Sequence, residues 1–292
     1  KTMITSEKIK NLRIKTGAGM MDCKKALEET KGEIDSAVDW LRKKGISTAQ
    51  KKSARDASEG LITISMKDDC ASIIEINSET DFVARNKDFQ DFCKRISDLV
   101  VEKKINNIDD INEISMNDSS LKVKDELTSM ISKVGENLVI KRLKYIGGDE
   151  IYVQKYIHNS ANEISGKIGV ILCYSCTENT VDQQSFAKNI CMHIAATDPK
   201  SLTSDDLDKG MIEREKDIYL EQMKNSGKPQ EIVEKIIAGK INKFYEEVCL
   251  MEQFFVMENK VKIKSYVENN NKTHSKDFKI LSFTLFKVGE NV

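Results

Sequence analysis

The spacing of apolar residues changes at Gly60, and this change limits the chain to a mixed α+β fold. Before Gly60, apolar residues at positions 34, 37, 38 and 41 recur three and four apart, the spacing of an amphipathic helix. Over 61–76, apolar and polar residues alternate on both sides of the turn at Lys67-Asp68-Asp69, which is typical of a β-hairpin. Purely helical and purely β architectures are therefore excluded.

The first 45 residues predict three short helices. The segment Thr16-Gly17-Ala18-Gly19 separates the first two, because paired glycines interrupt a helical pattern. Gly45 is expected to end the third helix as a C-terminal cap. We therefore expect a helical domain over 1–46 and a helical or flexible linker over 47–59.

A hairpin followed by a helix occurs twice in the remaining sequence. The first hairpin, at 61–76, precedes an apolar stripe over 89–100, then a helix at 118–132 and a strand at 138–145. The second hairpin, at 152–157 and 167–174, precedes a helix that stops before Pro199. This repetition predicts a two-part core of antiparallel sheets flanked by helices, with one part at 60–147 and the other at 148–200 and 247–292.

Two long helical patterns, at 205–224 and 229–246, interrupt the second part. Their connector places Gly227 just past one helix and Pro229 just inside the next. Because a short connector forces neighbouring helices to be antiparallel, 201–246 is expected to be a helical hairpin or coiled coil.

The composition excludes several classes of partner. Lys and Arg number 46 against 47 Asp and Glu, so the chain lacks the basic excess of a phosphate-binding protein. No apolar run approaches the roughly 18 residues that span a bilayer. Seven cysteines are an odd number, which indicates a reducing compartment rather than a disulfide framework. We expect neither nucleic acid nor membrane as a partner.

The motifs of common enzyme classes are also missing. The sequence has no phosphate-binding loop, dinucleotide fingerprint, zinc-protease helix or hydrolase elbow, and its three histidines do not cluster with carboxylates. Cys173 and Cys176 form a lone C-x-x-C motif. We interpret both as small buried side chains rather than as a redox or zinc site, because positions three apart in a strand point to opposite faces. We expect no catalytic residues, no metal and no cofactor.

Three positions allow both a structural and a functional interpretation. Met20 and Met21 follow a glycine turn, and either plug their own domain or form an exposed contact. On position alone, Phe82 is expected to pack onto the sheet and Asp81 to cap the turn, with Asn86 or Asp88 capping the next helix. His193 is expected in the core or at an interface edge.

Five segments, in order, resemble signatures of the elongation factor Ts family, and the resemblance spans about residues 5–290. The segments are Thr16–Leu27, Thr80–Ala84, Val134–Asn137, Met192–Ala196 and Ser226–Ile232.

The resemblance implies a guanine-nucleotide exchange factor that binds elongation factor Tu in its GDP-bound and nucleotide-free forms. It further implies a ubiquitin-associated-like N-terminal domain, a two-part core and a protruding coiled coil that mediates dimers in some members. The N-terminal contacts it implies are Arg13, Met20, Met21 and Lys24. The loop near the magnesium of the nucleotide carries Thr80, Asp81, Phe82 and Val83, and further core contacts are Val134, Gly135, His158 and His193.

Several alternatives stay open at this point. A non-catalytic adaptor using the helical domain, and more remotely a thiol oxidoreductase, are the other functional hypotheses. The lysine-rich composition and a start at Lys1 are typical of a processed protein of an organelle matrix, in a mitochondrion or plastid, with a bacterial cytoplasm as the alternative.

Overall fold

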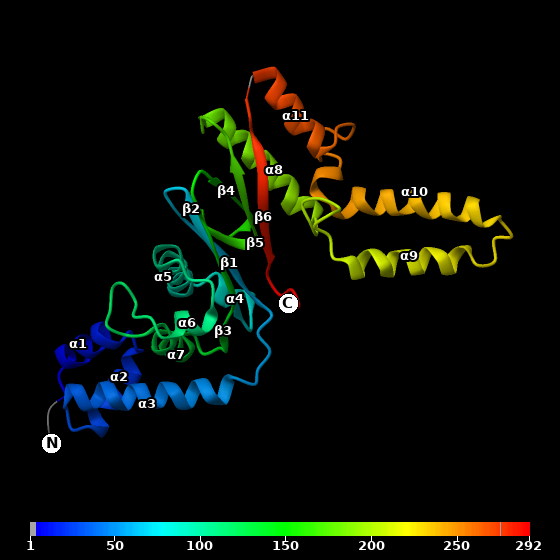
Figure 1. Cartoon of the computed structure of the whole chain (residues 1–292). Helices are drawn as coiled ribbons and strands as arrows, with labels where there is room; N and C mark the ends of the chain where they lie inside the picture. Colours follow the sequence, from blue (N-terminus) through cyan, green and yellow to red (C-terminus); the bar gives the residue numbers. More distant parts are fainter. Residues whose placement is uncertain (1–3, 275) are drawn as a thin grey trace. The chain divides into compact units, whose positions relative to one another are not determined.

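The computed structural model describes residues 4–274 and 276–292 (Figure 1). The chain divides into two compact units. Unit 1 holds the chain up to Ile146 together with Asn159–Gly169 and Phe286–Val292, and unit 2 holds Gly147–His158 and Val170–Leu285. Each unit therefore combines segments that are distant in the sequence.

Unit 1 begins with the three expected helices. They are α1 (Ser6–Thr16), α2 (Met20–Glu29) and α3 (Ile34–Lys52). Gly17, with a φ of 67°, ends α1 in the left-handed conformation. The helices enclose a small apolar core made of Leu12, Cys23, Ala26, Leu27 and Ala37.

The prediction that Gly45 ends the third helix is wrong. Gly45 is buried inside α3, which continues to Lys52 and so includes the first part of the expected linker. A Cβ on Gly45 would lie 3.4 Å from the Thr128 methyl group of α7 (Val123–Val134). The glycine therefore allows α3 to pack closely on α7, and its position in the sequence resembles a cap only by coincidence.

The first expected hairpin is confirmed. Strands β1 (Glu59–Lys67) and β2 (Cys70–Ser78) pair antiparallel from Glu59↔Ser78 to Lys67↔Cys70. Strand β3 (Leu138–Ile146) pairs antiparallel with β2 on its other side.

The second hairpin consists of β4 (Tyr152–Ser160) and β5 (Ser165–Ser175). The first residues of β5 pair with β1, at Ile62↔Gly166 and Thr63↔Ser165. The strands form one six-stranded sheet, in which five strands follow the order β3-β2-β1-β5-β4 and the sixth, β6 (Lys279–Lys287), also pairs with β5. We had expected separate sheets. Pairing of β1 with β5 removes two strand edges that would otherwise be open.

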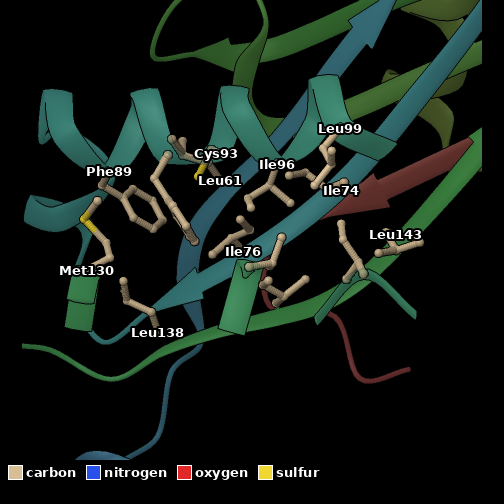
Figure 2. Close-up of a cluster of buried hydrophobic side chains, with 14 of the residues drawn as sticks. Leu61, Ile74, Ile76, Phe89, Cys93, Ile96, Leu99, Met130, Leu138 and Leu143 are labelled. Atoms are coloured by element: carbon tan, nitrogen blue, oxygen red, sulfur yellow. The ribbon is translucent and has the colours of Figure 1, made fainter. Parts of the chain in front are cut away.

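The core of unit 1 lies between its strands and α5 (Lys87–Lys103). Asn86 is the N-cap of α5 and accepts a hydrogen bond from the Phe89 amide, which confirms one of the two expected caps. Figure 2 shows side chains of α5 directed at those of β1 and β2, among them Phe89, Ile96, Leu61 and Ile76. Burial of each stabilises the fold by about 1.5–3 kcal/mol. The short helix α6 (Ile108–Asn112) and α7 complete this core.

Unit 2 has an aromatic core between its strands, α8 (Val181–Thr197) and α11 (Ile263–His274). Tyr174 stacks on Phe278 with ring centroids 4.7 Å apart, and Phe255 stacks on Tyr266 at 4.2 Å. As expected, α8 ends before Pro199. The 3-10 turn η1 (Leu250–Glu252) was not predicted.

The remaining helices, α9 (Lys209–Met223) and α10 (Gln230–Val248), run side by side and are joined by a short connector (Figure 1). At the base of the two helices lies a small buried apolar cluster, which consists of Leu207, Phe244 and Cys249. No described helix of the chain is both long and apolar enough to cross a membrane.

Candidate functional site

Phe82 lies in the one-turn helix α4 (Asp81–Ala84), between β2 and α5. Its neighbours Val83 and Ala84 are buried, whereas the Phe82 side chain is 83% exposed, the largest exposed fraction of any described large apolar residue. The interpretation that Phe82 packs onto the sheet is therefore wrong. An aromatic ring held in solvent on a short turn is available for contact with another molecule.

Thr80 is fixed by the carboxylate of Glu136. The Thr80 amide donates to Glu136 Oε2 at 3.0 Å, and the Thr80 hydroxyl donates to Oε1 at 2.6 Å. Glu136 follows Gly135, which ends α7 with a φ of 78° that favours glycine. Two segments 56 residues apart in the sequence, both singled out above, are thus in direct contact.

Asp81 forms two ion pairs rather than serving only as a cap. Its Oδ1 lies 2.7 Å from Lys167 Nζ, and its Oδ2 lies 2.9 Å from Arg85 Nη2. The hydrogen bond from Lys167 is the main cause that lowers the pKa of the Asp81 carboxyl below its usual value. The carboxylate is therefore charged at neutral pH.

The N-terminal helices carry exposed apolar side chains as well as exposed cations. Met20 and Met21 are 59% and 72% exposed, so they do not plug their own domain. Arg13 and Lys24, also exposed, lie on α1 and α2. Ile14 of α1, 74% exposed, was missed, although an isoleucine outside the apolar stripe of α1 was a visible signal. Below, the methionine surface means Met20 and Met21.

Val134 and Gly135 directly precede Glu136, the residue that contacts Thr80, whereas the remaining candidate, His158, belongs to unit 2. Val134 is half-buried at the end of α7, and Gly135 is exposed. His158, in unit 2, is exposed, and its Nδ1 lies 3.0 Å from the Tyr156 hydroxyl. All three therefore have surface that another protein could reach, although for Val134 it is limited.

His193 differs from the other candidates because it is completely buried. Its Nε2 lies 2.9 Å from Gln253 Oε1, and its Nδ1 lies 3.2 Å from the Val256 amide nitrogen, which donates to it. Burial lowers the pKa of His193, so the ring is neutral at physiological pH. In this structure His193 has no surface for a partner, and it holds the segment that carries Val256.

That segment, 254–257, is a second exposed apolar surface that sequence reasoning missed. Phe254, Val256 and Met257 are each at least 41% exposed, while Phe255 between them is buried. The signal was the run Phe-Phe-Val-Met outside any helical stripe.

The cysteines do not have the chemistry of a redox site. Cys173 is buried and Cys176 is half-buried, and neither is in a disulfide. Burial raises the pKa of Cys176, the opposite of an activated thiolate. Within 4–274 and 276–292, no three His, Cys, Asp or Glu side chains gather in a metal-binding arrangement.

Comparison with known proteins gives one consistent result. The family model "Elongation factor TS" matches residues 79–290. The elongation factor Ts of Rhodospirillum centenum is 41% identical over 292 residues, which cover 99% of this chain and 94% of that protein. The elongation factors Ts of Bartonella henselae and Rickettsia prowazekii are 42% and 41% identical, with 94% and 93% of their lengths covered by 99% of this chain.

Proposed function

The chain belongs to the elongation factor Ts family, and from this membership we propose that Phe82 is the group with which it drives GDP from elongation factor Tu. The protein is a nucleotide exchange factor for elongation factor Tu and not an enzyme. The observation that carries the proposal is the exposure of Phe82 on a turn held on both sides by side chains.

Exchange requires that factor and nucleotide weaken each other's binding, and this coupling is reciprocal. The sequence has no phosphate-binding loop, so the factor does not imitate the nucleotide. It instead favours a conformation of the partner in which GDP and Mg²⁺ are held poorly. Because Mg²⁺ demands near-ideal octahedral geometry, a small displacement of one ligand is costly. A rigid aromatic ring produces such a displacement, since packed elements of the partner move as units.

The other exposed surfaces supply affinity in this proposal. The methionine surface offers flexible apolar side chains suited to a helix or groove of the partner. The exposed Arg13 and Lys24 of the same helical domain add charged contacts. Val134, Gly135 and His158 add contacts from elsewhere in the chain. Segment 254–257, held by His193, forms a further contact. These surfaces bind both the GDP-bound and the nucleotide-free partner.

The finer architecture is also part of the proposal. Residues 1–46 act as a ubiquitin-associated-like domain, and 201–246 as a coiled coil that can join a second copy. Exposed Ile218, Leu220 and Ile232 on this helical hairpin support such a dimer. Sedimentation at increasing concentration measures it directly.

We further place the protein in an organelle matrix of a eukaryote, with a bacterial cytoplasm as the alternative. The relatives named above are alphaproteobacterial proteins, which is consistent with either source.

Release of labelled GDP from elongation factor Tu tests the proposed function. The chain should accelerate release, and raising free Mg²⁺ should slow the accelerated reaction. A non-catalytic adaptor would bind elongation factor Tu or another protein without changing the rate of release, and that result would contradict the proposal.

A further inference from the structure

The helix that carries Phe82 cannot maintain its own conformation. Helix α4 has four residues, and the Thr80 side chain makes no capping bond to it. Helices this short are unstable alone, because nucleation costs more than one turn of hydrogen bonds returns. The orientation of Phe82 therefore depends on contacts from outside α4.

Glu136 provides one outside contact, and it reaches only Thr80, at the N-terminal edge of α4. Arg85 pairs with Asp81 from the adjoining residues of the chain and is mostly exposed. Exposed pairs at this spacing contribute little to stability. Val83 and Ala84, buried in the core of unit 1, hold the far end of α4. Asp81, at the start of the helix beside Phe82, needs a contact of its own.

That contact comes from Lys167 on β5, which is distant from α4 in the sequence and belongs to unit 1. Its ammonium lies 2.7 Å from Asp81 Oδ1 and 3.2 Å from Glu59 Oε2, and donates to the Gly60 carbonyl at 3.1 Å. These three acceptors match the three donors of a lysine ammonium.

The position of Lys167 is itself fixed. Its backbone carbonyl accepts a hydrogen bond from the Val288 amide at 2.9 Å. Its neighbour Gly166 is paired with Ile62 of β1. The ammonium thus links α4 to the start of β1 through a strand that is anchored on both sides.

We propose that Lys167 is a positioning residue for nucleotide exchange: it holds Asp81, and through it sets the orientation in which Phe82 meets elongation factor Tu. The proposal rests on the proposed role of Phe82. Without the Lys167 ammonium, Asp81 keeps only Arg85. The start of α4 then samples conformations in which the Phe82 ring points elsewhere, while Val83 and Ala84 stay in the core.

The test compares Lys167→Met, which keeps the aliphatic stem, with Lys167→Arg, which keeps the charge. Release of labelled GDP from elongation factor Tu is measured over a range of factor concentrations for both variants. Lys235→Met is the matched control, because Lys235 is an exposed lysine of α10 paired with Glu231. Melting curves verify that each variant is folded.

We expect Lys167→Met to lower the saturating release rate roughly threefold to fivefold, the scale of a partly exposed ion pair. The half-saturating concentration should change little, and Lys167→Arg should restore most of the rate. In an Asp81→Ala background, Lys167→Met should have no further effect. The pKa of Asp81, measured by NMR, should rise in Lys167→Met.

Two results overturn the inference alone while Phe82→Ala still lowers the saturating rate: a wild-type rate for Lys167→Met, or independent effects of Lys167→Met and Asp81→Ala. If Phe82→Ala itself leaves the saturating rate unchanged, the proposed function fails, and the inference fails with it.

Discussion

At the scale of single residues, the burial of His193 links its charge to the stability of segment 254–257. The neutral ring donates from Nε2 to Gln253 and accepts at Nδ1 from the Val256 amide, so a proton on Nδ1 would destroy the second bond. Burial lowers the pKa of His193 below the usual 6.5, which the unfolded chain retains. Between these two values the unfolded chain binds more protons, so stability falls as pH falls.

We therefore expect His193 to make the protein less stable as pH drops from above 6.5 through the lowered pKa of the folded state. The comparison is between melting temperatures of wild type and His193→Gln at pH 7.5, 6.5 and 5.5. Both proteins keep the other histidines, so the difference isolates His193. The wild type should lose its advantage over the variant on acidification, and parallel curves would contradict this expectation.

The local sequence indicated where the candidate residues lie along the chain better than whether their side chains are buried or exposed. The sequence left open whether Met20 and Met21 pack within their own domain or form an exposed contact. The turn at Phe82 was placed correctly between β2 and α5. Whether Phe82 points into the core or into solvent depends on Val83 and Ala84 filling the space beneath α4, which no local spacing reveals.

At the scale of elements, the pentapeptide Lys-Val-Gly-Glu-Asn occurs twice in the chain, and its glutamate makes a different contact in each copy. Lys133–Asn137 follows α7, and its Glu136 fixes Thr80. Lys287–Asn291 ends β6, and its Glu290 accepts a hydrogen bond from Arg142 at 2.9 Å. The sequence shows the repeat, but the partner of each glutamate is set by the tertiary fold.

Glu136→Ala should lower the saturating rate of GDP release roughly threefold to tenfold, because Thr80 loses two hydrogen bonds to a charged group. Glu113→Ala is the matched control, since Glu113 accepts from Lys122 and Lys124 away from α4. Rates from stopped-flow release of labelled GDP distinguish the two variants. Equal rates for both would show that Glu136 does not support the site.

The boundaries of elements were the least predictable feature. Gly45 was expected to end α3 because glycine is common just past helix ends. Its actual role, close packing on Thr128, depends on a residue 83 positions away. Periodicity within one element carries no such information.

At the scale of the whole molecule, we assign affinity and exchange to different elements. The methionine surface lies on α2, whereas Phe82 lies on α4. Deleting the N-terminal helices would mix effects on affinity with effects on the exchange rate, because Ala49 of α3 packs on the core of unit 1. Point variants on the methionine surface avoid this problem.

Met20→Ala combined with Met21→Ala should raise the half-saturating concentration roughly tenfold or more, given the apolar area these side chains offer. The saturating rate should stay near that of wild type. The measurement is a titration of GDP release against factor concentration. A reduced saturating rate with an unchanged midpoint would assign the methionine surface a direct role in release.

The α+β class and most of the helices and strands were predictable from periodicity and turn residues, whereas α6 and α11 were not predicted. The assembly of unit 1 from three separate segments was not. The pair Asp81–Lys167 depends on β5 returning beside β1, and an ion pair between residues so far apart leaves no local pattern in the sequence.

The central claim is that Phe82 acts on the rate of GDP release rather than on binding. The decisive measurement is the saturating rate of release from elongation factor Tu for Phe82→Ala, together with its affinity for the nucleotide-free partner. We expect the saturating rate to fall about tenfold or more, as for truncation of an aromatic hot spot, with a modest loss of affinity. A saturating rate equal to that of wild type would contradict the claim.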